Sequence, residues 1–161
     1  MPLVRSAASW LDEYAQSHQH PTNKALHWIC VPVIVWCVIG FLWCIPTPSA
    51  LRSFSGASWP ANWATLAVVS ALIYYAFLSV PLALGVAPVL LAMIASVAAL
   101  AASIRVPLWA VCAVLFVLAW IGQFVGHAIE GKRPSFFKDV QFLLIGPLWL
   151  MAGLYRRFGL G

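Results

Sequence analysis

Charged residues are scarce in this sequence. Of its 161 residues only 8% are Asp, Glu, Lys or Arg, whereas 63% are hydrophobic. In an ordinary soluble domain roughly a quarter of the residues are charged. Because small domains leave much of their surface exposed, a water-soluble fold of this size could not bury so much apolar surface. The composition therefore excludes an ordinary soluble domain and predicts an integral membrane protein.

Familiar catalytic and ligand-binding motifs are absent as well. The sequence has no Gly-rich phosphate loop, no GxSxG nucleophile elbow and no HExxH zinc motif. Its nine basic residues form no stripe with interleaved aromatics, so no nucleic-acid partner is expected. Cys30, Cys37 and Cys44 recur every seven residues, which on a helix separates neighbours by about 10 Å. These thiols cannot share one metal ion, and we interpret them as small apolar side chains.

Apolar runs are what the sequence has in abundance. They lie at about 28–45, 62–84, 85–104, 106–125 and 140–155. Each of the first four has nearly the length of about 20 residues that spans hydrocarbon, whereas the last is short and contains Gly146-Pro147. Residues 3–18 place Leu3, Trp10 and Tyr14 on one face of a helix, which predicts an amphipathic surface helix. We therefore predict an all-α fold: residues 1–161 form a single membrane domain, a helical bundle with about four spanning helices, an N-terminal amphipathic helix and a C-terminal short or re-entrant apolar helix.

The number of spans decides which polar residues can meet. Four crossings between His27 and His127 would return the chain to the side from which it started. The basic residues favour this topology: Arg5, Lys24, Lys132, Arg133 and Lys138 fall on that side, and Arg52 and Arg105 fall on the other. By the positive-inside rule, the side that carries more basic residues faces the cytoplasm. We expect the inner membrane in a bacterium or the endoplasmic reticulum in a eukaryote, with the functional face toward the cytoplasm.

All four histidines lie at this predicted cytoplasmic rim. His18 and His20 precede the first span, His27 opens it, and His127 closes the fourth. Convergent neutral imidazoles are typical of a site for iron, zinc or copper. The membrane desaturases and hydroxylases carry two metals on eight or more histidines, so four histidines here could hold one metal ion at most.

Polar neighbours of the histidines have the spacing of a supporting shell. Asn23 and His27 are four residues apart and share a helical face. Gln123, His127 and Glu130 are spaced i, i+4 and i+7. We predict His18, His27 and His127 as metal ligands, with His20 and Glu130 as further candidates and with Asn23 and Gln123 orienting the ligands.

Two sequence blocks resemble a known family. The block Tyr14–Pro32, YAQSHQHPTNKALHWICVP, resembles the N-terminal signature Y-x3-H-x-N-P-x-N-x3-H-x4-P of small multipass proteins related to the fungal 2-hydroxy fatty acid dioxygenase. The block Gln123–Leu150, QFVGHAIEGKRPSFFKDVQFLLIGPLWL, resembles the matching second half, in which GH is followed by Glu and by a basic-Pro pair. One departure is visible, because His20 stands where the signature has Asn.

The resemblance implies an enzyme that uses Fe(2+) and O2 to shorten a 2-hydroxy fatty acid by one carbon, releasing CO2, in the alpha-oxidation of fatty acids and the degradation of sphingoid bases. His18, His27 and His127 fall on the family's histidine positions and would act as the catalytic metal ligands. We expect Arg133 or Lys132 to pair with the substrate carboxylate, and the alkyl chain to lie between helices.

Three other interpretations remain open. Two rim histidines could be axial ligands of a haem in an electron-transfer protein. The histidines could instead cap the helices of a non-catalytic membrane scaffold. Zinc also accepts three histidines and a water, as in a hydrolase, and only the family resemblance favours iron. The sequence does not predict an oligomeric state.

Overall fold

The computed structural model describes residues 6–49, 61–134 and 141–160. In these ranges the chain is all-helical, as predicted, with six helices and no strand. The helices are α1 (Ala7–Gln16), α2 (Pro21–Cys44), α4 (Trp63–Leu78), α5 (Val80–Ser103), α6 (Leu108–Glu130) and α7 (Phe142–Arg157). Leu3, Arg5, Arg52, Lys138 and residue 140, which entered the predictions above, lie outside the described residues.

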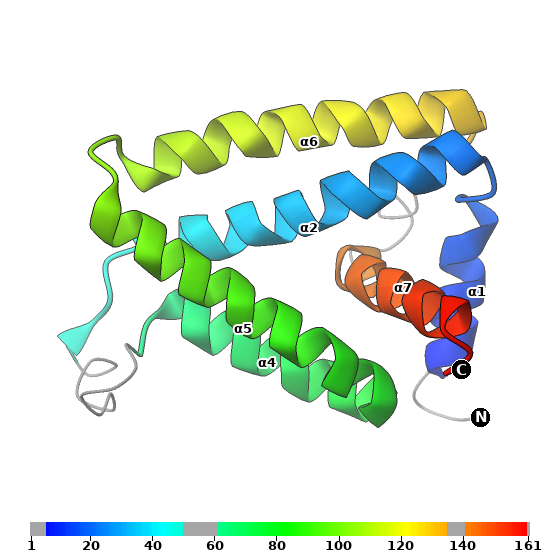
Figure 1. The fold of residues 1–161 in the computed structure, drawn as a ribbon, viewed down its shortest axis with the longest axis horizontal. Helices are drawn as coiled ribbons and strands as arrows, with labels where there is room; N and C mark the ends of the chain where they lie inside the picture. The colour runs from blue at the N-terminus through cyan, green and yellow to red at the C-terminus, as the bar shows by residue number, and fades with distance from the viewer. Residues whose placement is uncertain (1–5, 50–60, 135–140, 161) are drawn as a thin grey trace.

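Two long helices, α2 and α6, form the central packed pair of the bundle. They lie side by side and run in opposite directions (Figure 1). Their close approach depends on glycine, because a Cβ atom at Gly122 would lie 2.7 Å from the Cys30 sulfur, and one at Gly126 would overlap the Asn23 side chain. The start of α2 and the end of α6 are thereby held together at one end of the bundle.

Both of these helices extend beyond the apolar runs predicted from the sequence. The run predicted at 28–45 begins at Pro21, because the His20 side chain caps the helix and proline is favoured in a first turn. The run predicted at 106–125 continues to Glu130 and ends at Gly131, whose φ of 70° is left-handed. Hydropathy located only the apolar part of each helix, whereas the capping residues determine where each helix begins and ends. The additional turns carry His27 and His127.

Helices α4 and α5 form a tight hairpin. The predicted boundary between 62–84 and 85–104 is wrong: α4 ends at Leu78, and Ser79 separates it from α5. Pro81 lies in the first turn of α5, where its fixed φ and missing N–H are tolerated, and it does not interrupt the preceding helix.

Three helices, α2, α5 and α6, are long and apolar enough to cross a membrane. Helix α4 is apolar but has 16 residues, so its crossing, and with it a total of four spans, stays a prediction. Running one after another, α2, α4, α5 and α6 bring the chain back to the end of the bundle where α2 begins (Figure 1).

The two terminal helices pack against each other at this same end. Helix α1 buries Trp10 and Tyr14, and both rings contact Phe142 of α7. The apolar face of α1 is thus covered largely by protein. Helix α7 contains Pro147 and runs from Phe142 to Arg157, so it begins and ends two residues later than the predicted run. Whether α7 is re-entrant stays a prediction.

Candidate metal centre

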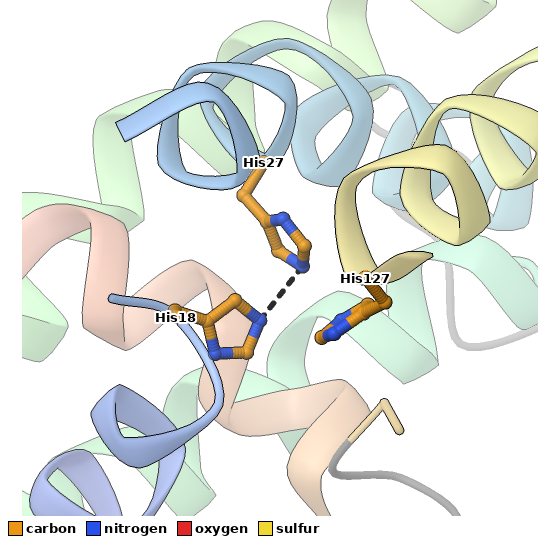
Figure 2. Close-up of side chains that lie close together, drawn as sticks. All are labelled: His18, His27 and His127. Atoms are coloured by element: carbon orange, nitrogen blue, oxygen red, sulfur yellow. Dashed lines mark hydrogen bonds between the residues drawn. The ribbon is translucent and has the colours of Figure 1, made fainter. Parts of the chain in front are cut away.

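Three histidines from three different segments meet inside the bundle. His18 follows α1, His27 lies in the second turn of α2, and His127 lies in the last turn of α6. All three side chains are buried, with 1%, 2% and 5% of their surface exposed. One ring nitrogen from each lies within 4.8 Å of the others, and the rings converge on a common point (Figure 2). A group of this kind can hold one metal ion.

Hydrogen bonds that the rings donate to backbone carbonyls fix two of these histidines. His18 Nδ1 lies 2.6 Å from the Tyr14 carbonyl oxygen, and His27 Nδ1 lies 2.9 Å from the Asn23 carbonyl oxygen. A carbonyl only accepts, so each Nδ1 carries the proton and each Nε2 is left with a lone pair. Ligand histidines in metal sites are oriented in this way.

The two free nitrogens face each other. His18 Nε2 and His27 Nε2 lie 2.8 Å apart (Figure 2). Since both are acceptors in the neutral tautomers set by the backbone, their lone pairs repel unless a proton or a metal cation lies with them. A shared proton would require an imidazolium, and burial opposes that charge. Burial lowers the pKa of His18 from 6.5 to about 4, while the Tyr14 carbonyl acts in the opposite direction.

The third histidine also presents an unused nitrogen. His127 Nδ1 is buried and has no hydrogen-bond partner among the described residues. A buried polar atom left without a partner costs about 1–3 kcal/mol, so such atoms in native proteins usually have a function. The donor set of three neutral imidazoles, with two rings oriented by carbonyls, fits a divalent metal such as iron or zinc.

Two further candidate ligands lie elsewhere. His20 is exposed and caps α2, its Nδ1 accepting the Thr22 N–H at 3.2 Å. Glu130 accepts the backbone N–H groups of Gln19 at 2.9 Å and His20 at 2.7 Å. Neither residue belongs to the three-histidine group. Direct ligation by either residue therefore stays a prediction that this arrangement does not favour. Glu130 fastens the end of α6 to the segment that carries His18.

Asn23 and Gln123, which were predicted to orient the ligands, differ in their contacts. Asn23 is fully buried, and its side-chain amide donates to the Glu130 carboxylate and to the Ser17 backbone carbonyl. Its backbone carbonyl accepts the hydrogen bond from His27 Nδ1. Gln123, 5% exposed, forms no hydrogen bond to the three histidines and lines a cavity.

The two basic residues after α6 are exposed. Lys132 Nζ donates to the Gln16 carbonyl at 2.6 Å and so ties α6 to α1. Neither Lys132 nor Arg133 lines the cavity beside the histidines. Pairing of either residue with a substrate carboxylate therefore stays a prediction that this arrangement does not favour.

A large apolar cavity begins at the histidines. Its volume is about 500 Å³, and its walls come from α1, α2, α4, α5, α6 and α7. His18, His27 and His127 line it together with aliphatic residues that reach Leu42 near the far end of α2. The arrangement can place the polar end of a long apolar molecule beside a metal.

Tyr14 was missed as a site residue by the sequence analysis. Its ring stacks on His18 with centroids 4.1 Å apart and an interplanar angle of 9°, and its carbonyl holds the same histidine. Burial raises the pKa of its phenol, so the hydroxyl stays protonated. The available signal was its place as the first residue of the block Tyr14–Pro32.

Comparison with known proteins gives one match. A family model described as "2-hydroxy-palmitic acid dioxygenase Mpo1-like" matches residues 4–158. The match contains all three clustered histidines and agrees with the resemblance drawn from the two sequence blocks. No curated protein and no solved structure matches the chain.

Proposed function

The chain belongs to the Mpo1-like family, and from this premise we propose that it is an iron(II)-dependent membrane dioxygenase. The proposed reaction converts a 2-hydroxy fatty acid and O2 into the fatty acid one carbon shorter, CO2 and water. These products account for all atoms and for the four electrons that O2 accepts, so no second oxidant or 2-oxo acid is required.

The observation that carries the proposal is the junction between the histidine cluster and the apolar cavity. From His27 to Leu42 the lining of the cavity follows α2 for about 22 Å, at 1.5 Å per residue. An extended chain of sixteen carbons is about 19 Å long, because each C–C bond advances it by about 1.25 Å. A long-chain 2-hydroxy acid thus matches the cavity in length and polarity, with its head at the histidines.

The protein's own groups have distinct tasks in this proposal. His18, His27 and His127 would hold the metal, and the carbonyls of Tyr14 and Asn23 keep two of the rings in the ligating tautomer. Iron(II), when bound, would supply O2 reactivity and a Lewis acid for the carboxylate and hydroxyl of the substrate. The apolar walls exclude water from the reacting end of the chain.

The position of the histidine cluster near the ends of α2 and α6 suits a substrate that is dissolved in the bilayer. The alkyl chain would stay between apolar helices, while the head group meets the metal near the ends of α2 and α6. We propose that this end faces the cytoplasm, because Lys24, Lys132 and Arg133 lie there.

The geometry supports a non-haem metal better than the alternatives. His18 Nε2 and His27 Nε2 lie only 2.8 Å apart, so no macrocycle can lie between them as it does between two axial ligands. A scaffold protein would have no use for three buried imidazoles whose free nitrogens converge. Zinc fits the same donors, and the family's description as a dioxygenase favours iron.

Metal analysis and turnover test the proposal together. Protein purified without oxygen should contain one iron per chain and should convert 2-hydroxypalmitate to the fifteen-carbon acid with uptake of O2. His27→Ala should lose both the iron and turnover. His20→Ala is the matched control, because this exposed histidine caps α2 outside the cluster. Full activity of His27→Ala, or a zinc-loaded protein as active as the iron form, would overturn the assignment.

A further inference from the structure

Tyr14 and Gln123 are polar side chains in the cavity wall, near the histidines in chain position, and have no hydrogen-bond partner among the described residues. Tyr14 and Gln123 are only 6% and 5% exposed, and both line the cavity. No hydrogen bond joins the Tyr14 hydroxyl or the Gln123 amide to the residues that the structure describes. Buried polar groups nearly always have a partner, so a polar ligand group is expected at this place.

The two side chains belong to two different helices, each of which also leads to one of the clustered histidines. Tyr14 belongs to α1 and stacks on His18. Its hydroxyl lies beside α7, since a Cβ atom at Gly146 would be 3.2 Å from the phenol oxygen. Gln123 belongs to α6 and lies one helical turn before His127, on the same face. Both groups therefore belong to the part of the cavity next to the histidines, whereas most of the remaining wall is aliphatic or aromatic, with Tyr75 and Gln141 as further polar side chains.

We propose that Tyr14 and Gln123 form the site that recognises the head group of the substrate, the inference resting on the proposed function. The Tyr14 hydroxyl can both donate and accept, which suits the 2-hydroxyl group of the ligand. The Gln123 amide carries two N–H donors, which suits a carboxylate. Tyr14 accordingly selects 2-hydroxy acids over plain fatty acids, and Gln123 takes the place that the sequence analysis gave to Lys132 and Arg133.

The test measures binding to metal-free protein, so that it is independent of turnover. 2-Hydroxypalmitate and palmitate each compete with a fluorescent fatty acid for the protein in lipid nanodiscs. The wild type should prefer 2-hydroxypalmitate. Tyr14→Phe keeps the ring that stacks on His18 and removes only the hydroxyl, and it should bind 2-hydroxypalmitate about tenfold more weakly, as expected for one hydrogen bond. Its affinity for palmitate should not change.

Gln123→Leu should weaken the binding of both acids equally, by roughly tenfold or more, because a hydrogen bond to a charged group is the stronger kind. Tyr155→Phe is the matched control for Tyr14→Phe, since the Tyr155 hydroxyl donates to the Pro81 carbonyl at 2.9 Å and Tyr155 does not line the cavity. It should bind both acids as the wild type does.

Several results would overturn the inference. Wild-type affinity for both acids in Tyr14→Phe and Gln123→Leu would do so. Weaker binding of Co²⁺ to Tyr14→Phe would also do so, because the hydroxyl would then act through His18 and not on the ligand. If the wild type discriminates between the acids as expected but contains no iron and has no activity, the head-group site stands and the proposed dioxygenase reaction is wrong.

Discussion

The Nε2 atoms of His18 and His27 lie 2.8 Å apart, and the Nδ1 atom of each ring is held by a backbone carbonyl four residues earlier in the chain. The local chain thus sets the tautomer of both rings, and the tautomer turns two lone pairs toward each other. His127 brings a further buried nitrogen, Nδ1, for which the described part of the chain offers no hydrogen-bond partner. The fold concentrates acceptors at one point, so a cation should stabilise it.

Metal binding should therefore raise the stability of the purified protein. Any ligand that binds only the folded state stabilises it, by about 2.7 kcal/mol at one hundred times its Kd. We expect Fe²⁺ added without oxygen to raise the unfolding temperature of the chelator-treated protein in detergent by several degrees. His27→Ala should show no such rise, whereas His20→Ala should respond as the wild type does. An equal rise in all three proteins would mean that the metal binds elsewhere.

Glu130 should control the metal site without touching the metal. Its carboxylate accepts the backbone N–H groups of Gln19 and His20 and the side-chain amide of Asn23. Glu130→Gln should weaken these bonds and loosen the segment that carries His18, so we expect metal affinity to fall by roughly tenfold to a hundredfold. Titration with Co²⁺, followed by its visible absorption, measures this affinity.

The control for Glu130 has the same change of charge at an exposed position. Asp12 on α1 is exposed and lies outside the histidine group, so Asp12→Asn should bind Co²⁺ as the wild type does. If Glu130→Gln and Asp12→Asn had the same affinity as the wild type, Glu130 would be a surface contact only.

The sequence predicted which histidines meet better than it predicted the ends of the helices. Hydropathy located the apolar part of α2 and α6, but the turns that carry His27 and His127 are set by the cap at His20 and by Gly131. The boundary at Ser79 was missed because Pro81 can either end one helix or begin the next, and hydropathy is the same in both cases. Such choices depend on local geometry that a single sequence does not contain.

Supporting contacts were predictable only in part. Spacing along one helix placed Asn23 and Gln123 near the histidines, because residues four apart share a face. It could not show that Glu130 reaches back across the chain to Gln19 and His20, or that Tyr14 stacks on His18. These contacts join elements that are distant in sequence, and only the packed structure defines them.

Acid should destabilise the metal-free protein through His18. The pKa of this imidazole is lowered by burial from 6.5 to about 4 in the folded state. Between pH 4 and pH 6.5 this residue binds more protons in the unfolded chain than in the folded chain. The free energy of unfolding therefore rises with pH in this range and changes little above about pH 6.5. Lowering the pH from 7 to 4 should remove stability on the order of 3 kcal/mol from this group.

Thermal unfolding of the wild type and of His18→Gln, measured in detergent across this pH range, isolates the effect. Glutamine does not titrate, so the variant should lose less stability between pH 6.5 and 4 than the wild type. Parallel curves would show that His18 is not responsible for the acid sensitivity.

Close packing of α2 on α6 should be as important for the site as the ligands themselves. A Cβ atom at Gly126 would overlap the side chain of Asn23, whose carbonyl holds His27. Gly126→Ala should therefore push α2 away from α6, lower stability by about 1–3 kcal/mol and weaken Co²⁺ binding. Gly153→Ala provides the comparison, because a Cβ atom there would lie 3.5 Å from its nearest neighbour, Trp28, which is an ordinary contact. We expect Gly153→Ala to retain both the unfolding temperature and the Co²⁺ affinity of the wild type. If Gly126→Ala retained both as well, the close approach of the two helices would not be what holds His27 and His127 together.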